Sequence, residues 1–489
     1  MSAAPAGENG PDPTGGTPLY PFLFSLYPVL FLYQHNIREV PWTEALLAAV
    51  VCLSIAIVFW PFTHLMSSQA QKRGLLLFLF LLLFHTYGLY YDLVVDWLPR
   101  ALPLPAVHTL AFVLPGGAFI LLSLSVLRAR AGLAAVQRTL TAIILCLIAW
   151  NLAGILIHHG RSLYWQANRH GWEKHPAAEG RHSAPDIYCL ILDEFAAPES
   201  ARSLFGYDNS AFCDRLRQMG FFVARDSRSP FLETERALAS LLNPNDDGNH
   251  GDPFQSARAN QVVVFLKERG YRIIEFPAAR AMFMAAADRR YFYSLERVSI
   301  FFNDFYRTLF ERSLLRILPE RWSRESPDAS RYYRERVLQV FEKLPEVMKI
   351  PSPKFVFVHL YCPHEPFIFD ARGGPAAAEH FWDHADRNAY LQQYIFVSAK
   401  MLETATAILA SSPRPPVIII QSDHGYRGSR GRKKWRRRVE PAESTRVFNS
   451  LYLPGVSADT IAPSLSPLDN FRLIFNLYFA TAYPLAAKP

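Results

Sequence analysis

Long apolar runs dominate the first third of the chain and are separated by short polar stretches. These runs occupy residues 19–33, 46–62, 75–93, 107–127 and 140–157. A helix that crosses a membrane needs about 20 predominantly apolar residues, and all five runs meet or approach that length. The first run is the weakest because Pro21 and Pro28 interrupt it. The pattern predicts a transmembrane domain of about five helices over residues 19–160.

Positively charged residues indicate how these helices are oriented. Lys72 and Arg73 precede the third run, and three arginines lie between the fourth and fifth runs. The alternate connections carry only Arg38 and Arg100, beside acidic residues. Because positive residues stay on the cytoplasmic side, we expect the amino terminus inside and the chain after residue 157 outside. The chain is therefore expected to be a multi-pass protein of the inner (plasma) membrane with an extracytoplasmic domain.

The rest of the chain divides into a tail, a linker and a globular domain. Residues 1–18 are rich in glycine, proline and alanine, and we expect them to be disordered. Residues 161–184 are polar and aromatic by turns, which is typical of a solvated linker or of an amphipathic segment on the outer leaflet. Over residues 185–489, short apolar runs alternate with amphipathic helical patterns, among them one expected helix over residues 200–220. This alternation predicts an α/β domain with a doubly wound, mostly parallel sheet.

Three short apolar runs in this domain each deliver an acid or a histidine at their carboxyl end. The runs at 187–192, 355–360 and 417–420 are followed by Asp193 and Glu194, by His364, and by Asp423 and His424. The carboxyl ends of parallel strands are where ligands gather in such sheets. Oxygen ligands with one imidazole suit Mn²⁺, Zn²⁺ or Mg²⁺. We therefore expect Asp193, Glu194, Asp423 and His424 to form a metal site, although one of the two adjacent acids could instead cap the next helix.

Thr234 is the candidate nucleophile. It lies just before the helical run 237–242, at a loop-to-helix junction. A hydroxyl at a helix N-terminus faces free backbone N–H groups and the positive end of the dipole, and beside a divalent cation it can become an alkoxide. The other interpretation is an ordinary threonine N-cap. Glu233 and Glu235 flank this residue with negative charge.

Four motifs together resemble those of the alkaline phosphatase superfamily, in particular its sulfatase-like membrane branch. They are LDEF, FLETERALASLLN, FVFVHLYCPHEPF and IIIQSDHG, which occur in that order over about residues 185–425. Five helices ahead of such a domain look like lipoteichoic acid synthases and phosphoethanolamine transferases. The resemblance implies that Glu194, Asp423 and His424 are metal ligands, with Asp193 as a further candidate. It also implies that Thr234 carries a covalent phospho-intermediate and that His364 contacts the substrate phosphoryl group or its leaving oxygen.

The chain departs from parts of this family in two ways. The C/S-x-P-x-R motif of formylglycine sulfatases is absent from the sequence, which disfavours a sulfate ester substrate. No histidine follows His424, so a single divalent ion (Mn, Zn or Mg, with Ca also open) is the better match.

One run near the carboxyl end of the chain is rich in basic residues. Much of the net charge of +8 lies in residues 427–438, and we expect Arg427 to contact substrate. This run is typical of a solvated loop, or of a site for anionic phospholipid or envelope glycan; outside the cell, nucleic acid is not an expected partner.

The five cysteines form no CxxC pair and predict no disulfide framework.

The function expected from these features is that of a membrane-anchored, metal-dependent enzyme acting on phospho-groups. Transfer to an acceptor hydroxyl through Thr234 is favoured over hydrolysis, because a membrane tether concentrates lipid donor and acceptor together. The alternatives are a phosphodiesterase or sulfatase-type hydrolase and a sulfatase-like scaffold without activity.

Overall fold

The computed structural model describes most of the chain and divides it into two units. The described residues are 17–97, 103–130, 133–167, 185–245, 251–279, 282–292, 304–318, 327–376, 381, 386–428 and 441–485. One unit comprises residues 1–164 with 299–322, and the other residues 165–298 with 323–489. Most of the expected tail, most of the linker and most of the basic run lie outside the described residues.

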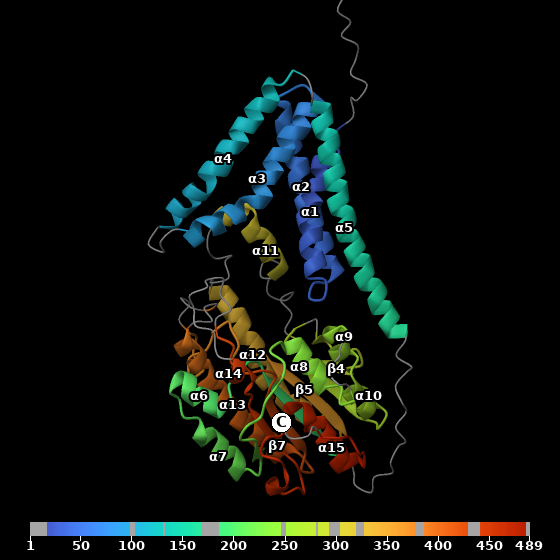
Figure 1. The fold of residues 1–489 in the computed structure, drawn as a ribbon, viewed down its shortest axis with the longest axis vertical. Helices are drawn as coiled ribbons and strands as arrows, with labels where there is room; N and C mark the ends of the chain where they lie inside the picture. The colour runs from blue at the N-terminus through green and yellow to red at the C-terminus, as the bar shows by residue number, and fades with distance from the viewer. Residues whose placement is uncertain are drawn as a thin grey trace, which may run out of the picture. The chain divides into compact units, whose positions relative to one another are not determined.

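Five helices open the membrane unit (Figure 1). They are α1 (Tyr20–His35), α2 (Trp42–His64), α3 (Ala70–Trp97), α4 (Leu104–Arg128) and α5 (Leu133–Ala167). Among the described residues, α2 to α5 are long and apolar enough to span a membrane. The 16 residues of α1 extend only about 24 Å at 1.5 Å each, short of the roughly 30 Å hydrocarbon core. Of the five expected membrane spans, four are therefore supported among the described residues, and α1 is too short to cross the hydrocarbon core as a straight helix.

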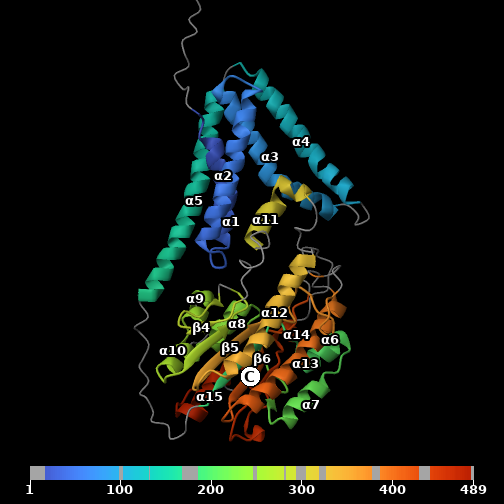
Figure 2. The ribbon, with the colours of Figure 1, turned by 180° about the vertical axis from the view of Figure 1, so that it is seen from behind.

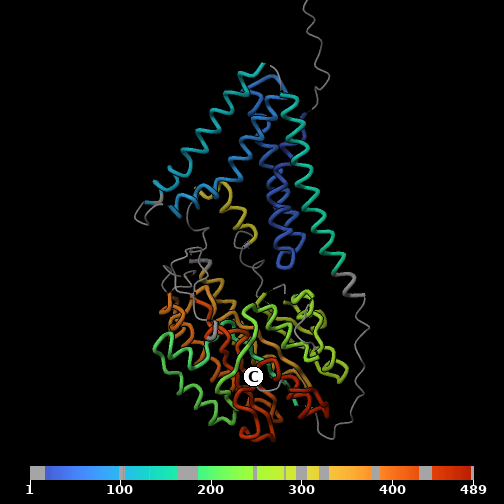
Figure 3. Tube along the Cα trace, in the orientation of Figure 1, coloured from blue at the N-terminus to red at the C-terminus, as the bar shows by residue number. Residues whose placement is uncertain are grey.

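A segment from the second half of the chain also belongs to the membrane unit. Helix α11 (Asp304–Arg312) and the 3₁₀ helix η5 (Leu314–Ile317) group with the membrane helices. In Figure 3 this segment is the yellow trace beside the blue helices. The sequence pattern had placed these residues in the α/β domain.

A seven-stranded sheet forms the centre of the α/β domain. Its strands are β1 (Ile187–Leu192), β2 (Phe222–Val223), β3 (Arg272–Phe276), β4 (Arg289–Arg290), β5 (Lys354–Leu360), β6 (Val417–Ser422) and β7 (Asn449–Tyr452). Their order is β2-β7-β6-β1-β5-β3-β4. The pairs from β6 to β4 are parallel, whereas β7 runs antiparallel to both β6 and β2. The sheet is thus mixed, so the expectation of a doubly wound, mostly parallel sheet is supported only in part, for the strands from β6 to β4.

Helices cover both faces of this sheet, as Figure 2 shows. They are α6 (Pro198–Phe205), α7 (Ser210–Gln218), α8 (Thr234–Leu241), α9 (Pro253–Arg258), α10 (Gln261–Lys267), α12 (Pro327–Met348), α13 (Arg387–Ser411), α14 (Pro441–Thr445) and α15 (Asn470–Phe479). Alternate residues of β1 enter two separate cores: Tyr188 packs with residues of α12 and α13, and Ile187 with residues of α8, α10 and α15. Because successive strand side chains point to opposite faces, a strand buried on both sides reads as one continuous apolar run.

One expected helix is divided in the structure. The helix predicted over residues 200–220 is α6 followed by α7, and α6 ends at Gly206. Gly206 has φ +68°, a left-handed conformation that glycine adopts without the steric cost of a Cβ atom.

Candidate active site and metal centre

Asp193, Asp423 and His424 come together at the carboxyl ends of β1 and β6. One ligand atom from each lies within 4.8 Å of the others. His424 Nε2 is 3.6 Å from Asp193 Oδ1 and 3.5 Å from Asp423 Oδ2. All three side chains are buried, so the group is shielded from solvent.

Two carboxylate oxygens in this group lack a protein hydrogen bond. Asp423 Oδ1 accepts from the backbone N–H groups of Glu194, at 3.1 Å, and His424, at 2.8 Å. Among the described residues, neither Asp423 Oδ2 nor Asp193 Oδ1 has a hydrogen-bond partner. Buried polar atoms are normally satisfied, and a buried unpaired charge is costly. The donor set therefore fits a divalent cation between these oxygens and the imidazole.

His424 is oriented by its neighbour in the chain. Its Nδ1 lies 2.9 Å from the carbonyl oxygen of Gly425, which can only accept, so Nδ1 carries the proton and Nε2 offers a lone pair. A Cβ atom on Gly425 would lie 2.4 Å from the carbonyl oxygen of Arg446. The glycine of the DHG motif is thus required by the close approach of residues 443–446.

Thr234 is the first residue of α8, and its hydroxyl faces the same group. Its Oγ1 lies 3.4 Å from His424 Nε2. The N-cap position belongs to Glu233, which makes no side-chain cap. The alternative interpretation of Thr234 as the N-cap is therefore wrong.

Glu194 is not one of the three residues of this group, and its carboxylate contacts other residues. Its Oε1 accepts from the backbone N–H of Arg427 at 2.7 Å, and its Oε2 lies 3.8 Å from His364 Nε2. Its φ of +61° is uncommon for a residue with a Cβ atom, and such backbone strain concentrates at functional sites. The turn that brings the Glu194 N–H to Asp423 thus directs the Glu194 carboxylate toward Arg427.

Arg427 connects several parts of the site. Its Nη1 donates to the carbonyl oxygen of Leu232 at 3.0 Å, and its Nη2 lies 3.1 Å from His364 Nε2. Leu232 is two residues before Thr234, so Arg427 joins the loop that carries Thr234 to His364 and Glu194. The sequence-predicted residues thus lie in two adjoining sets, one around His424 and one around Arg427.

Opposite charges shift two pKa values in this region. Burial alone would raise the pKa of Asp193, but His364, His359 and His424 outweigh it and lower that pKa well below its usual range. Burial alone would lower the pKa of His364, but the carboxylates of Asp193 and Glu194 outweigh it and raise that pKa. Both shifts favour the charged forms.

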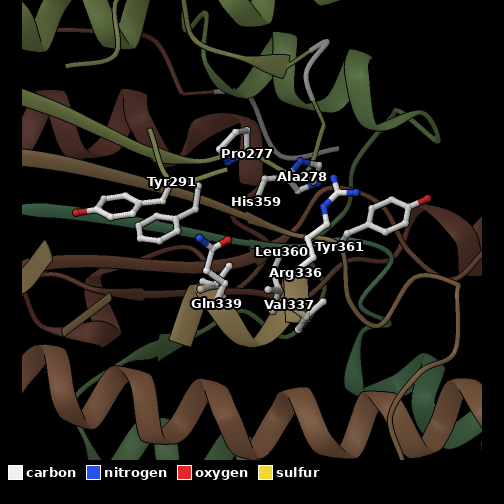
Figure 4. Close-up of a pocket in the computed structure, with 11 residues that line it drawn as sticks. Pro277, Ala278, Tyr291, Arg336, Val337, Gln339, His359, Leu360 and Tyr361 are labelled. Carbon is white, nitrogen blue, oxygen red and sulfur yellow. The ribbon is translucent and has the colours of Figure 1, made fainter. Parts of the chain in front are cut away.

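His359 is a site residue that the sequence reasoning missed. It lies in β5, is buried, and places Nε2 3.3 Å from Asp193 Oδ2. Figure 4 shows it among the residues that line a pocket of about 20 Å³, together with Arg336 and Tyr361. The available signal was one imidazole within the otherwise apolar run 355–360.

No protein family and no curated protein matches the sequence. Among solved structures, the fold is similar to the periplasmic domain of EptC from Escherichia coli in a complex with Zn, at 14% identity and a TM-score of 0.41, covering 62% of this chain and 84% of that one. It is also similar to the lipooligosaccharide phosphoethanolamine transferase EptA from Neisseria meningitidis, at 11% identity and a TM-score of 0.44, covering 95% and 96%. A third similar structure is that of the lipoteichoic acid synthase LtaP from Listeria monocytogenes, at 14% identity and a TM-score of 0.38, covering 64% of this chain and 76% of that one.

These are the kinds of protein that the sequence motifs resemble.

Proposed function

We propose that this chain is a membrane-anchored, metal-dependent phosphotransferase that acts on lipid or envelope-glycan phospho-groups through Thr234. The observation that supports it most is the convergence of Asp193 Oδ1, Asp423 Oδ2 and His424 Nε2 beside the Thr234 hydroxyl. Packing of a structural core does not explain why two buried carboxylate oxygens that lack hydrogen-bond donors lie next to a hydroxyl.

Asp193, Asp423 and His424 would hold one divalent cation, with Zn²⁺, Mn²⁺ and Mg²⁺ all compatible with the donors. Such a cation lowers the pKa of a neighbouring hydroxyl and neutralises charge that develops on phosphoryl oxygens. Glu194, in this proposal, supports Arg427 rather than ligating the ion.

The chain's own residues perform the transfer in two steps. The Thr234 hydroxyl gives up its proton and its oxygen forms a bond to phosphorus, while the bond from phosphorus to the leaving oxygen breaks. The leaving oxygen takes up a proton and departs as an alcohol, and a phosphothreonine ester results. Arg427, which contacts Leu232 near Thr234, would bind the phosphoryl oxygens together with His364. An acceptor hydroxyl then displaces Thr234, which restores the free threonine; water in place of the acceptor would make the enzyme a hydrolase.

Membrane anchoring favours the acceptor over water. A lipid donor and an envelope acceptor at the same surface have a high effective concentration. The proposed location is the plasma membrane, with the α/β domain on the extracytoplasmic side, as the lysine and arginine distribution predicts.

The test is a trapped intermediate on the full-length protein in detergent. Incubated with a phosphodiester lipid and digested, the wild type should yield a peptide that carries the phospho-group on Thr234. Thr234→Ala should lower turnover by at least about 10³-fold while the protein stays folded. Thr406→Ala, at an exposed position of α13, is the matched control. Normal turnover by Thr234→Ala, or an adduct on another residue, would refute the assignment.

A further inference from the structure

Residues 304–318 pack against the membrane helices although the chain on either side of them belongs to the α/β domain. Figures 1 and 3 show α11 beside α1 and α3. The α/β domain is thus joined to the membrane unit both by the chain after α5 and by the two chain segments that flank residues 304–318.

The start of this segment inserts an aromatic side chain into the membrane unit. Phe305 is only 3% exposed and packs with Val29 of α1 and with Ala48 and Cys52 of α2. Tyr306 Oη donates to the carbonyl oxygen of Glu44 at 3.1 Å. These contacts bury apolar surface and satisfy a backbone acceptor near the start of α2.

The end of α11 approaches α3 at a glycine. A Cβ atom on Gly88 would lie 2.1 Å from the carbonyl oxygen of Glu311 and 2.6 Å from Cα of Arg312. Atoms do not approach so closely, so the contact exists only because residue 88 has no side chain.

Two arginines of the segment share one carboxylate of α3. Arg312 Nη1 lies 2.9 Å from Asp92 Oδ2, and Arg316 Nη1 lies 2.8 Å from Asp92 Oδ1. The Arg316 guanidinium also stacks 3.9 Å above the centre of the Tyr91 ring, a cation–π contact. The ion pairs, the cation–π contact and the close approach at Gly88 together indicate that residues 304–318 make a specific contact with α3.

All of these contacts lie at one end of the helix bundle. Tyr33 and Val29 are near the carboxyl end of α1, Glu44 is near the amino end of α2, and Asp92 is near the carboxyl end of α3. The lysine and arginine distribution predicts that this end faces outward. The position of the inserted segment is therefore consistent with the orientation that this charge distribution predicts.

We propose that residues 304–318 are a docking element that tethers the α/β domain to the membrane unit. The tether allows the α/β domain to act on substrates that lie in the membrane. This inference rests on the proposed phosphotransferase function. The docking element is required for turnover of a phosphodiester lipid in a bilayer, whereas the reaction at Thr234 with a water-soluble phosphodiester does not need it.

Gly88→Val tests the proposal, because any side chain there displaces Glu311 and Arg312. Gly117→Val is the matched control, since a Cβ on Gly117 of α4 meets nothing within 4 Å. Full-length proteins in vesicles are compared in two assays: the ratio of turnover on a bilayer phosphodiester lipid to turnover on a soluble aryl phosphodiester, and hydrogen exchange of residues 304–318.

We expect Gly88→Val to lower that turnover ratio at least tenfold and to increase exchange in residues 304–318, while Gly117→Val changes neither. If Gly88→Val does not fold, the double variant Arg312→Gln/Arg316→Gln provides the same test with a smaller expected loss. An unchanged ratio with increased exchange, or unchanged exchange in a folded variant, would overturn the proposal. A wild type inactive on both substrates would instead refute the proposed function, and the exchange experiment would still decide whether the segment docks.

Discussion

Two buried carboxylates flank the same strand, β1, and they differ in their hydrogen-bond partners. Asp186, just before the strand, accepts from Lys354 Nζ at 2.5 Å, from the Lys354 backbone N–H at 3.1 Å and from Ser352 Oγ at 2.9 Å. Asp193, just after it, has one oxygen near His359 and one with no hydrogen-bond partner among the described residues. Both side chains are nearly inaccessible to solvent.

The difference separates a structural ion pair from a binding site. At the amino end of β1 the protein supplies its own cation, Lys354, so the charge of Asp186 is neutralised within the chain. At the carboxyl end it supplies two acids and imidazoles but no lysine or arginine in contact with Asp193 or Asp423 among the described residues. The second arrangement fits a cation from outside the chain, which is what the proposed function requires.

The largest expected effect comes from breaking the structural pair. Lys354→Ala would leave Asp186 buried without its counter-charge, and we expect a loss of about 3–5 kcal/mol in stability, seen as a fall in Tm of roughly 10 °C. Lys343→Ala removes an exposed lysine paired with Glu346 and should leave the Tm nearly unchanged. Equal Tm values for the two variants would show that the Lys354 pair is not structural.

An intermediate effect is expected from His359, which would position Asp193 rather than touch substrate. His359→Ala should weaken metal affinity by about 10- to 100-fold, because Asp193 loses the imidazole that restrains its second oxygen. His359→Gln keeps an N–H donor and should restore part of that affinity. Isothermal titration of metal into the chelated full-length protein measures this, and equal affinities for wild type and His359→Ala would exclude the positioning role.

The smallest effect on stability should come from neutralising the other buried acid. In chelated protein, Asp193→Asn removes a charge that burial disfavours and the neighbouring imidazoles favour, so we expect these effects to offset and stability to change by no more than about 1 kcal/mol. Asp186→Asn, by contrast, leaves Lys354 without its partner and should destabilise by several-fold more. If both variants lose stability equally in thermal unfolding without metal, the two ends of β1 do not differ as described.

The sequence predicted the strands and the residues at their ends well, because each buried strand is a continuous apolar run that ends in polar residues. β1, β5 and β6 begin and end within two residues of the predicted runs. Thr234 was predicted at a helix start, and α8 begins there. These features depend on local pattern, which a sequence shows directly.

Other features depend on contacts that the sequence does not show. The direction of the Glu194 side chain follows from a left-handed backbone turn fixed by Asp423, a residue 229 positions away. Residues 304–318 resemble any amphipathic segment until their partners on α1 and α3 are known. His359 in β5 looks like an ordinary strand residue without the position of Asp193 on the neighbouring strand.

The most direct test of the account is the metal content of the purified full-length protein, measured by elemental mass spectrometry. We expect about one divalent ion per chain in the wild type and nearly none in Asp423→Ala. Asp226→Ala, which removes an exposed acid of the same domain, should retain the wild-type content. A folded Asp423→Ala variant that keeps the full metal content, or a metal-free wild type that still transfers phospho-groups, would contradict the central claim.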